Sequence, residues 1–296
     1  MTARASTMES AARRDREVRY TAADFLRLTQ FLHATTGIRL AEGNERMVYA
    51  RLASRVAELG LASFSAYIDL ATSPREVEEL DRLISALTTN TTHFYRESYH
   101  FDYLADTIMP GLIRRAREGD RIRIWSAGCS TGDEPYSIAL CLLTAFPDVA
   151  SHDVRILATD IDRTALARAA TASYAPNSLR DLPAPLLDKH FDTVPDTTHR
   201  TPKSAVRSLI TFRQLNLIGQ WPFKGPFDVI FCRNVAIYMD ADTQEHVWTG
   251  FRDVLRPDGH LFIGHSERLS ASLKADFSLV GTTTYRRNAM HGGERQ

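Results

Sequence analysis

The sequence predicts two parts, a small all-α domain followed by an α/β domain whose sheet is mostly parallel. From Thr21 to about Thr89, apolar residues recur at helical spacing, and no segment has the alternation of a strand. From residue 122 onward, short apolar strands alternate with helical segments, which is typical of a parallel sheet covered by helices on both faces. Residues 277–285 are typical of a final hairpin, which would add antiparallel strands to the sheet.

The expected all-α domain has recognisable helix starts. Thr21 and Asp24 form a capping-box pattern ahead of the first apolar run. Another helix is expected to begin at Ser73-Pro74, because serine caps helices and proline suits the first helical position. The apolar face of that helix should contain Val77, Leu80, Ile84 and Leu87.

The α/β part contains five predicted parallel strands and one interruption. The strands span residues 122–127, 155–159, 210–215, 227–232 and 260–264. Helices are expected from Pro135, over 165–170 and over 243–255, with a turn at 256–259. Residues 171–205 break the alternation and are interpreted as an inserted subdomain, because they hold Pro176, Pro183, Pro185, Pro195 and Pro202.

The composition excludes several classes of partner. Lysine plus arginine and aspartate plus glutamate each number 36, so no overall charge attracts nucleic acid or an anionic membrane. The apolar runs are shorter than the ~18 residues that a membrane span needs. Three cysteines without C-x-x-C spacing indicate a reducing compartment, with neither a disulfide framework nor a thiolate metal site. We therefore expect a cytoplasmic protein without a metal.

A glycine loop follows the first strand and predicts a ligand site. Gly128 and Gly132 permit close approach of a ligand at the carboxyl end of the strand. The dinucleotide pattern G-x-G-x-x-G and the P-loop lysine are both missing from this loop. Instead, Asp133 and Glu134 stand where a phosphate would bind, which favours a cationic ligand such as an ammonium or sulfonium group. Equally, two acids at a helix start could simply complement the helix dipole.

A second acidic pair follows the second strand. A carboxylate at this position can accept both hydroxyls of an adenosine ribose. Asp162 could instead cap the next helix, which would leave Asp160 as the ribose ligand. Together, the glycine loop and these acids are compatible with S-adenosylmethionine and poorly compatible with NAD or ATP.

Ordered motifs extend this argument into a resemblance. They are LTTNTTHFYRE (87–97), SAGCSTGDEPYS (126–137), ATDID (158–162), NL (216–217), PFDVIFCRNVAIY (226–238) and GHSE (264–267). In this order they resemble the chemoreceptor (MCP) glutamate methyltransferases, the CheR family. The resemblance runs from about residue 20 to 288. It implies a class I S-adenosylmethionine-dependent methyltransferase sheet, Rossmann-like, with a small inserted β-subdomain, after an all-α N-terminal domain.

The same resemblance implies boundaries and a cofactor pocket. The expected order is a flexible tail (1–19), a helical receptor-docking domain (20–89), a methyltransferase domain (90–288, with the insertion at about 171–205) and a tail (289–296). S-adenosylmethionine, which leaves as S-adenosylhomocysteine, is expected to contact Asn90, Thr92, Arg96, Gly128, Glu134, Asp160, Asn216, Leu217, Arg233 and Asn234. Arg96 would hold the methionine carboxylate, Glu134 the ammonium group and Asp160 the ribose.

The implied reaction is methyl transfer to glutamate side chains of a methyl-accepting chemoreceptor. Tyr238 is the expected catalytic residue beside Arg96, although its ring could instead pack against the sheet. No strong base is needed, because a glutamate with a pKa near ~4.3 is already ionised at neutral pH. Alignment of the reacting groups and exclusion of water would then supply most of the rate.

The all-α domain is expected to dock the cytoplasmic helical domain of the receptor. Arg51 and Arg55 are four residues apart and share one helix face, whereas Arg46 points elsewhere. A solvated basic flank is the alternative for this pair. Two other functions stay open: a methyltransferase with another acceptor, and a non-catalytic adaptor that binds the cofactor as a signal. We expect a monomer that neither binds nucleic acid nor inserts into the membrane.

Overall fold

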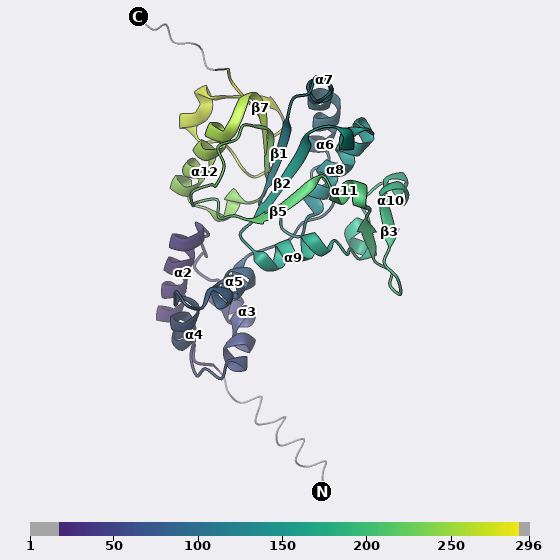
Figure 1. Cartoon of the computed structure of the whole chain (residues 1–296). Coiled ribbons are helices and arrows are strands. Elements are labelled where there is room, and N and C mark those ends of the chain that lie inside the picture. The colour runs from purple at the N-terminus through teal and green to yellow at the C-terminus, as the bar shows by residue number, and fades with distance from the viewer. Residues whose placement is uncertain (1–17, 290–296) are drawn as a thin grey trace, which may run out of the picture. The chain divides into compact units, whose positions relative to one another are not determined.

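The computed structural model describes residues 18–289 and divides the chain into two compact units, 1–88 and 89–296 (Figure 1). The predicted tail over 1–19 lies outside the described residues as far as residue 17. Val18 is buried in the core of the helical unit, and Arg19 forms an isolated parallel bridge with Ser63. The described part of this unit therefore includes residues ahead of the predicted domain start at residue 20.

The helical unit contains four described helices: α2 (Ala22–Thr36), α3 (Glu45–Glu58), α4 (Phe64–Ala71) and α5 (Val77–Leu87). The capping box at the start of α2 is confirmed, since Thr21 and Asp24 bond reciprocally. Ser63 caps α4, a short helix that the sequence analysis missed. Apolar side chains from all four helices form one core.

The predicted start of the last helix was wrong, and so was the place of Val77 on its buried face, whereas Ile84 and Leu87 are buried as predicted. Ser73 and Pro74 lie in a turn, closed by a hydrogen bond from the amide of Glu76 to the carbonyl of Ser73, where proline suits the second position. The helix begins later, at Val77, whose side chain is 58% exposed. Glu79 occupies the inward face instead, since an acid can be buried where it is paired.

Glu79 joins three helices of this unit. Its carboxylate accepts from Arg55 Nε and Nη2 of α3, at 2.9 and 2.6 Å, and from the Tyr67 hydroxyl of α4, at 3.1 Å. Arg51 donates to the carbonyl groups of Ala86 and Thr88 at the end of α5. Both arginines of the predicted docking pair are thus bonded within the unit. Their receptor role stays a prediction.

The second unit, residues 89–296, is built on a seven-stranded sheet in the order β5-β2-β1-β6-β7-β9-β8. The first five strands of this order are parallel, and β9 and β8 add an antiparallel hairpin, as predicted. The strands are β1 (Ile122–Ala127), β2 (Val154–Asp160), β5 (Ile210–Gln214), β6 (Phe227–Cys232), β7 (Leu255–Ile263), β8 (Phe277–Gly281) and β9 (Thr284–Arg287). Strand β7 starts at Leu255, ahead of the predicted turn, and its register with β6 shifts there.

Helices cover both faces of this sheet (Figure 1). Ile124 and Phe231 point into a core with α8, and their neighbours Trp125 and Ile230 point into a second core with α12. The flanking elements are α6 (Tyr99–Tyr103), η1 (Leu104–Ile108), α7 (Met109–Arg117), α8 (Asp133–Ala145), η2 (Val149–Ser151), α9 (Arg163–Thr171), η4 (Ala236–Tyr238), α12 (Ala241–Val254) and η5 (Ala271–Ala275).

The segment between α9 and β5 leaves the sheet and forms a small addition. Its only two strands pair antiparallel within the segment, outside the main sheet. Its elements are η3 (Pro176–Leu179), α10 (Ala184–His190), β3 (Phe191–Thr193), β4 (Arg200–Pro202) and α11 (Ser204–Arg207).

We expect Glu79→Gln to lower the free energy of unfolding of the helical unit by about 2 kcal/mol at neutral pH, because it weakens charge-assisted hydrogen bonds to a buried group. Urea titration measures this. The control is Asp69→Asn, whose ion pair with Arg27 is exposed and should contribute less than about 1 kcal/mol.

The loss of stability that Glu79→Gln causes should depend on pH. The hydrogen bond from Arg55 lowers the pKa of Glu79 below the ordinary glutamate value, although burial opposes this. The stabilisation is therefore present above the ordinary pKa and is lost as the pH falls through the lowered one. An effect of Glu79→Gln that persists unchanged in strong acid would contradict this account.

Candidate functional site

The predicted site residues of the second unit gather at the carboxyl ends of β1, β2 and β6. Strand β1 lies between β2 on one side and β6 on the other, so the chain leaves β1 at a point where the strand order reverses. Open α/β sheets bind ligands at such a point. Glu134 follows β1, Asp160 ends β2, and Arg233 and Asn234 follow β6.

The glycine loop is fixed by backbone hydrogen bonds to strand β2. The amides of Gly128 and Cys129 both donate to the carbonyl of Thr159, at 2.8 and 2.9 Å. Gly128 has a φ of +81°, and a Cβ there would meet the Val235 side chain at 2.3 Å. Gly132, with a φ of +94°, precedes α8. Both positions therefore require glycine. The close approach of a ligand expected at this loop stays a prediction.

The two acids at the end of β2 have different partners. Asp162 Oδ1 accepts from the amides of Thr164 and Ala165, so Asp162 is the cap of α9. Asp160 accepts from the amide of Ser130 at 2.7 Å and from the amide of Asp162 at 2.9 Å. It is buried directly beneath the glycine loop. Of the two acids, Asp160 is the one that does not cap a helix.

The remaining predicted residues lie in two loops beside these strand ends. Asn90 donates to Asp162 Oδ2 at 2.6 Å, and its carbonyl accepts from the Ser130 hydroxyl. Thr92 is half-buried in the same loop. On the other side, the amide of Leu215 bonds the carbonyl of Asp160, which brings the next two residues to the end of β2. These are Asn216, whose side chain accepts from the amide of Ile218, and the buried Leu217.

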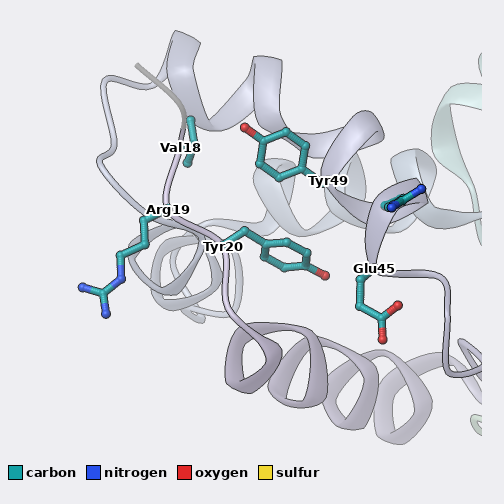
Figure 2. Close-up of a pocket in the computed structure, with 6 residues that line it drawn as sticks. Val18, Arg19, Tyr20, Glu45 and Tyr49 are labelled. Carbon is teal, nitrogen blue, oxygen red and sulfur yellow. The ribbon is translucent and has the colours of Figure 1, made fainter. Parts of the chain in front are cut away.

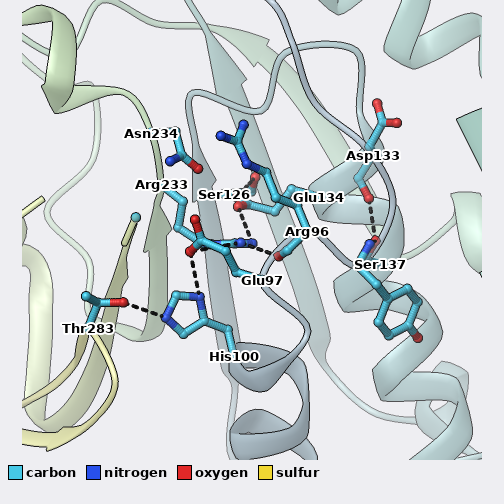
Figure 3. A network of polar contacts seen from close by, with 12 residues as sticks. Arg96, Glu97, His100, Ser126, Asp133, Glu134, Ser137, Arg233, Asn234 and Thr283 are labelled. Carbon is cyan, nitrogen blue, oxygen red and sulfur yellow. Dashed lines mark hydrogen bonds and ion pairs between the residues drawn. The ribbon is translucent and has the colours of Figure 1, made fainter. Parts of the chain in front are cut away.

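Arg233 is the centre of a buried ion cluster (Figure 3). Its side chain is 2% exposed and lies 3.3 Å from Glu97 and 3.3 Å from Glu134. It also donates to the carbonyl of Arg96. Glu134 accepts in addition from the Ser126 hydroxyl at 2.7 Å, and Glu97 pairs with the His265 ring at 2.8 Å. The cluster therefore joins β1, β6 and the loop ahead of α6.

The charges of this cluster leave one carboxylate in excess. Burial raises the pKa of Glu134, and the charge of Arg233 opposes that rise. Burial also opposes ionisation of Glu97, but His265 and Arg233 together lower its pKa to about 2. Burial raises the pKa of Asp160 as well. A bound cation would relieve this cost, whereas a pyrophosphate would meet two acids.

S-adenosylmethionine fits these residues. Asn234 Oδ1 and Arg233 Nε are buried without a hydrogen-bond partner among the described residues, so polar groups here await one. Acids supply acceptors for an ammonium group and for ribose hydroxyls. Arg96 is half-buried, and only its Nη1 has a hydrogen bond recorded, to the carbonyl of Thr91. Its other donors suit a carboxylate.

Four residues around this site adopt the left-handed conformation without being glycine. Tyr95 and Glu97 flank Arg96, with φ of 54° and 56°; Ser130 lies in the glycine loop with 48°, and Asn234 follows β6 with 59°. Such residues persist only where their surroundings hold them, and they concentrate at functional sites. Here two of them flank Arg96 and one is Asn234 itself, and both Arg96 and Asn234 are predicted to contact the cofactor.

Two acids of the site escaped the sequence analysis. Glu97 follows Arg96 directly, and Glu267 closes the GHSE motif, so both lay within recognised segments. Neither could be assigned a partner from spacing alone.

The structure also places two residues that the sequence analysis did name. Tyr238 ends η4 and is half-buried. Asp133, by contrast, accepts from the hydroxyl of Thr131 and is buried apart from the ion cluster.

The helical unit has a hollow of its own, with a volume of about 490 Å³ (Figure 2). It is lined by Val18, Arg19, Tyr20, Glu45, Arg46 and Tyr49. Burial, with the charges of Glu45 and Asp24, raises the pKa of Tyr20 to about 12, so this hydroxyl stays neutral. Within residues 18–289, no cluster of acids, histidines and cysteines is suited to a metal, and no helix is long and apolar enough to cross a membrane.

Sequence comparison decides the family. The SAM-binding domain of CheR methyltransferases matches residues 90–286, and the all-alpha domain of the same family matches residues 23–88. The chain belongs to the CheR methyltransferase family. This confirms the predicted family and α/β fold, with S-adenosylmethionine as the cofactor.

Curated relatives of this CheR protein are similar over most of their length. A probable chemotaxis protein methyltransferase of Rhizobium etli is 46% identical over 86% of this chain and 96% of its own. The chemotaxis protein methyltransferase of Escherichia coli is 40% identical, over 89% and 90%. Chemotaxis protein methyltransferase 2 of Pseudomonas aeruginosa is 42% identical, over 92% and 95%. The predicted assignment as a chemotaxis methyltransferase is confirmed at this level.

For this CheR protein we expect Asp160→Ala to weaken binding of S-adenosylhomocysteine about tenfold or more, because two buried hydrogen-bonding positions for the ribose are lost. Titration calorimetry measures the affinity, and circular dichroism checks the fold. The control is Asp153→Ala, which breaks an ion pair with Arg123 just ahead of the opposite end of β2. Affinity near that of the wild type would remove Asp160 from the ribose role.

Proposed function

We propose that this CheR protein methylates glutamate side chains in the cytoplasmic helical domain of a methyl-accepting chemoreceptor and forms glutamate 5-O-methyl esters. The observation that carries the proposal is the excess of buried carboxylates around Arg233, beside the carboxyl ends of β1 and β6, which suits a cationic methyl donor. The names of the chemotaxis methyltransferases described above support the receptor as substrate. The ester product follows from the resemblance of the site motifs.

Methyl transfer to a carboxylate requires mainly that the protein align the acceptor oxygen with the methyl group and the sulfur. When bound, S-adenosylmethionine supplies a methyl group on a positively charged sulfur, and transfer to a carboxylate oxygen leaves a neutral thioether and releases no proton. Glu134 and Asp160 hold the ammonium and ribose groups, and Arg96 holds the methionine carboxylate. Asn216 and Leu217 bond and cover the adenine. The acceptor glutamate is already ionised at neutral pH, so no side chain has to act as a base.

Tyr238 is the residue that we assign to the acceptor. It lies four residues beyond Asn234, at the end of the short helix η4, and is half-buried. Its hydroxyl would orient the acceptor carboxylate against the methyl group. The exposed Ile237 beside it offers apolar surface to the receptor helix.

The helical unit is proposed as the receptor-docking domain, over residues 20–89. Arg51 and Arg55 are only partly used by their bonds within the unit, because a guanidinium has five N–H donors. They remain able to meet acidic receptor helices. The protein is proposed to act as a monomer in the cytoplasm, which agrees with its three buried, unpaired cysteines.

The direct test is incubation with methyl-labelled S-adenosylmethionine and receptor-containing membranes. Label that is released by mild base supports glutamate esters. Base-stable label would identify another acceptor, and cofactor binding without any transfer would identify an adaptor. Either of these results would overturn the proposal.

Tyr238→Phe should slow methyl transfer about tenfold and leave the affinity for S-adenosylhomocysteine unchanged, because a single hydrogen bond at the acceptor is removed. Transfer at saturating cofactor gives the rate. Tyr285→Phe is the matched control, since Tyr285 is also half-buried but packs against the core from β9. If Tyr238→Phe transferred at the wild-type rate, its ring would have only a packing role.

A further inference from the structure

Glu267 occupies an unusual position for an acid of the second unit. It is 4% exposed, and none of the ion pairs recorded for the described residues includes it. Its carboxylate is instead surrounded by backbone N–H groups. Oε1 accepts from Val235, Ala236 and Ile237 at 2.9, 2.7 and 3.3 Å, and Oε2 accepts from Asn234 and Gly264 at 3.0 and 2.5 Å.

Four of these five donors belong to one turn, residues 234–237, which runs from the end of β6 into η4. Successive amides that point to one spot form an anion-binding concavity. They converge because Asn234 takes the left-handed conformation directly after β6. Without an acceptor these amides would lose hydrogen bonds in a buried place, which costs free energy. The carboxylate of Glu267 is what allows this turn to exist.

The same turn carries the two groups that matter for the reaction. Asn234 stands at its start, with a buried side-chain oxygen that has no partner among the described residues, and Tyr238 follows its end. Gly264, directly after β7, completes the set of five N–H donors around the Glu267 carboxylate, which we call the cage. A Cβ at Gly264 would lie 2.7 Å from Asn234 Nδ2 and 2.9 Å from Glu267 Oε2. Side chain, turn and glycine therefore fit one arrangement.

We propose that Glu267 is a positioning residue of the methyltransferase site, which sets Asn234 for the cofactor and Tyr238 for the acceptor through the backbone of residues 234–237. This inference rests on the roles proposed above for those two residues. Glu267 acts as an ionised group that only accepts hydrogen bonds. Burial raises the pKa of Glu267, and the hydrogen bonds from the turn and from Gly264 oppose that rise.

Glu267→Gln tests the charge without changing the size of the side chain. In either orientation, the amide nitrogen would face at least two backbone N–H groups, so the turn must shift. We expect the affinity for S-adenosylhomocysteine to fall about tenfold, and the transfer rate at saturating cofactor to fall about tenfold as well, per folded molecule.

Gly264→Ala reaches the same cage by another route and keeps the acid. The added methyl group would push against Asn234 and the carboxylate, so it should reproduce both losses. This variant decides the question if Glu267→Gln does not fold.

Asp228→Asn is the matched control. Asp228 is also 4% exposed and lies on β6, but it accepts from Arg115, Arg123 and Arg256 at the opposite end of the strand. Its loss should lower the melting temperature and leave affinity and rate per folded molecule unchanged.

The proposal is overturned if Glu267→Gln and Gly264→Ala bind and transfer like the wild type, or if Asp228→Asn shows the same losses per folded molecule. Binding of S-adenosylhomocysteine needs no receptor. A wild-type protein that transfers nothing to receptor membranes would therefore defeat the proposed function, and the affinity measurements would still test the positioning role.

Discussion

The arrangement of the second unit, which contains the SAM-binding domain, depends on one buried guanidinium. Arg233 holds the carboxylates of Glu97 and Glu134, which come from a loop ahead of α6 and from the start of α8. Removing charges from water costs several kcal/mol, and their attraction offsets this only when all partners are present. The cluster therefore fixes three distant segments at once. Because the cluster contains two carboxylates for one guanidinium, the same interaction that joins these segments would also favour the cationic ligand proposed above.

The strands of the second unit were predictable because a sheet buried on both faces leaves continuous apolar runs in the sequence. Strands β1 and β6 match their predicted ranges. The helical unit was harder. The short helix α4 was missed, and the next helix was expected to begin at Ser73-Pro74, since a turn with proline in its second position has the same residues as a helix start. Val77 was assigned to the core because the pairing of Glu79 with Arg55, 24 residues away, cannot be found by periodicity.

The site was predictable to the extent that strand ends determine it. Glycines, the acid that ends β2 and the residues after β6 stand at positions that any open α/β sheet brings together. The capping role of Asp162 was anticipated as one alternative. Glu97 and Glu267 carry no such mark, because their importance comes from partners contributed by other segments: a guanidinium for one and a row of amides for the other. Sequence reasoning finds the groups that face a ligand more readily than the groups that hold them.

Four of the left-handed residues that carry side chains lie around the site, and they have a consequence for any attempt to stabilise this protein. Tyr95, Glu97, Ser130 and Asn234 each hold a backbone shape that glycine would adopt with less strain, at about 1 kcal/mol apiece. Replacing them would nevertheless delete groups that we propose to surround the cofactor, or that flank Arg96, the proposed partner of the methionine carboxylate. Consensus-style stabilisation should therefore start in the outer helices and the inserted segment, because relieving backbone strain at the site would gain stability at the expense of activity.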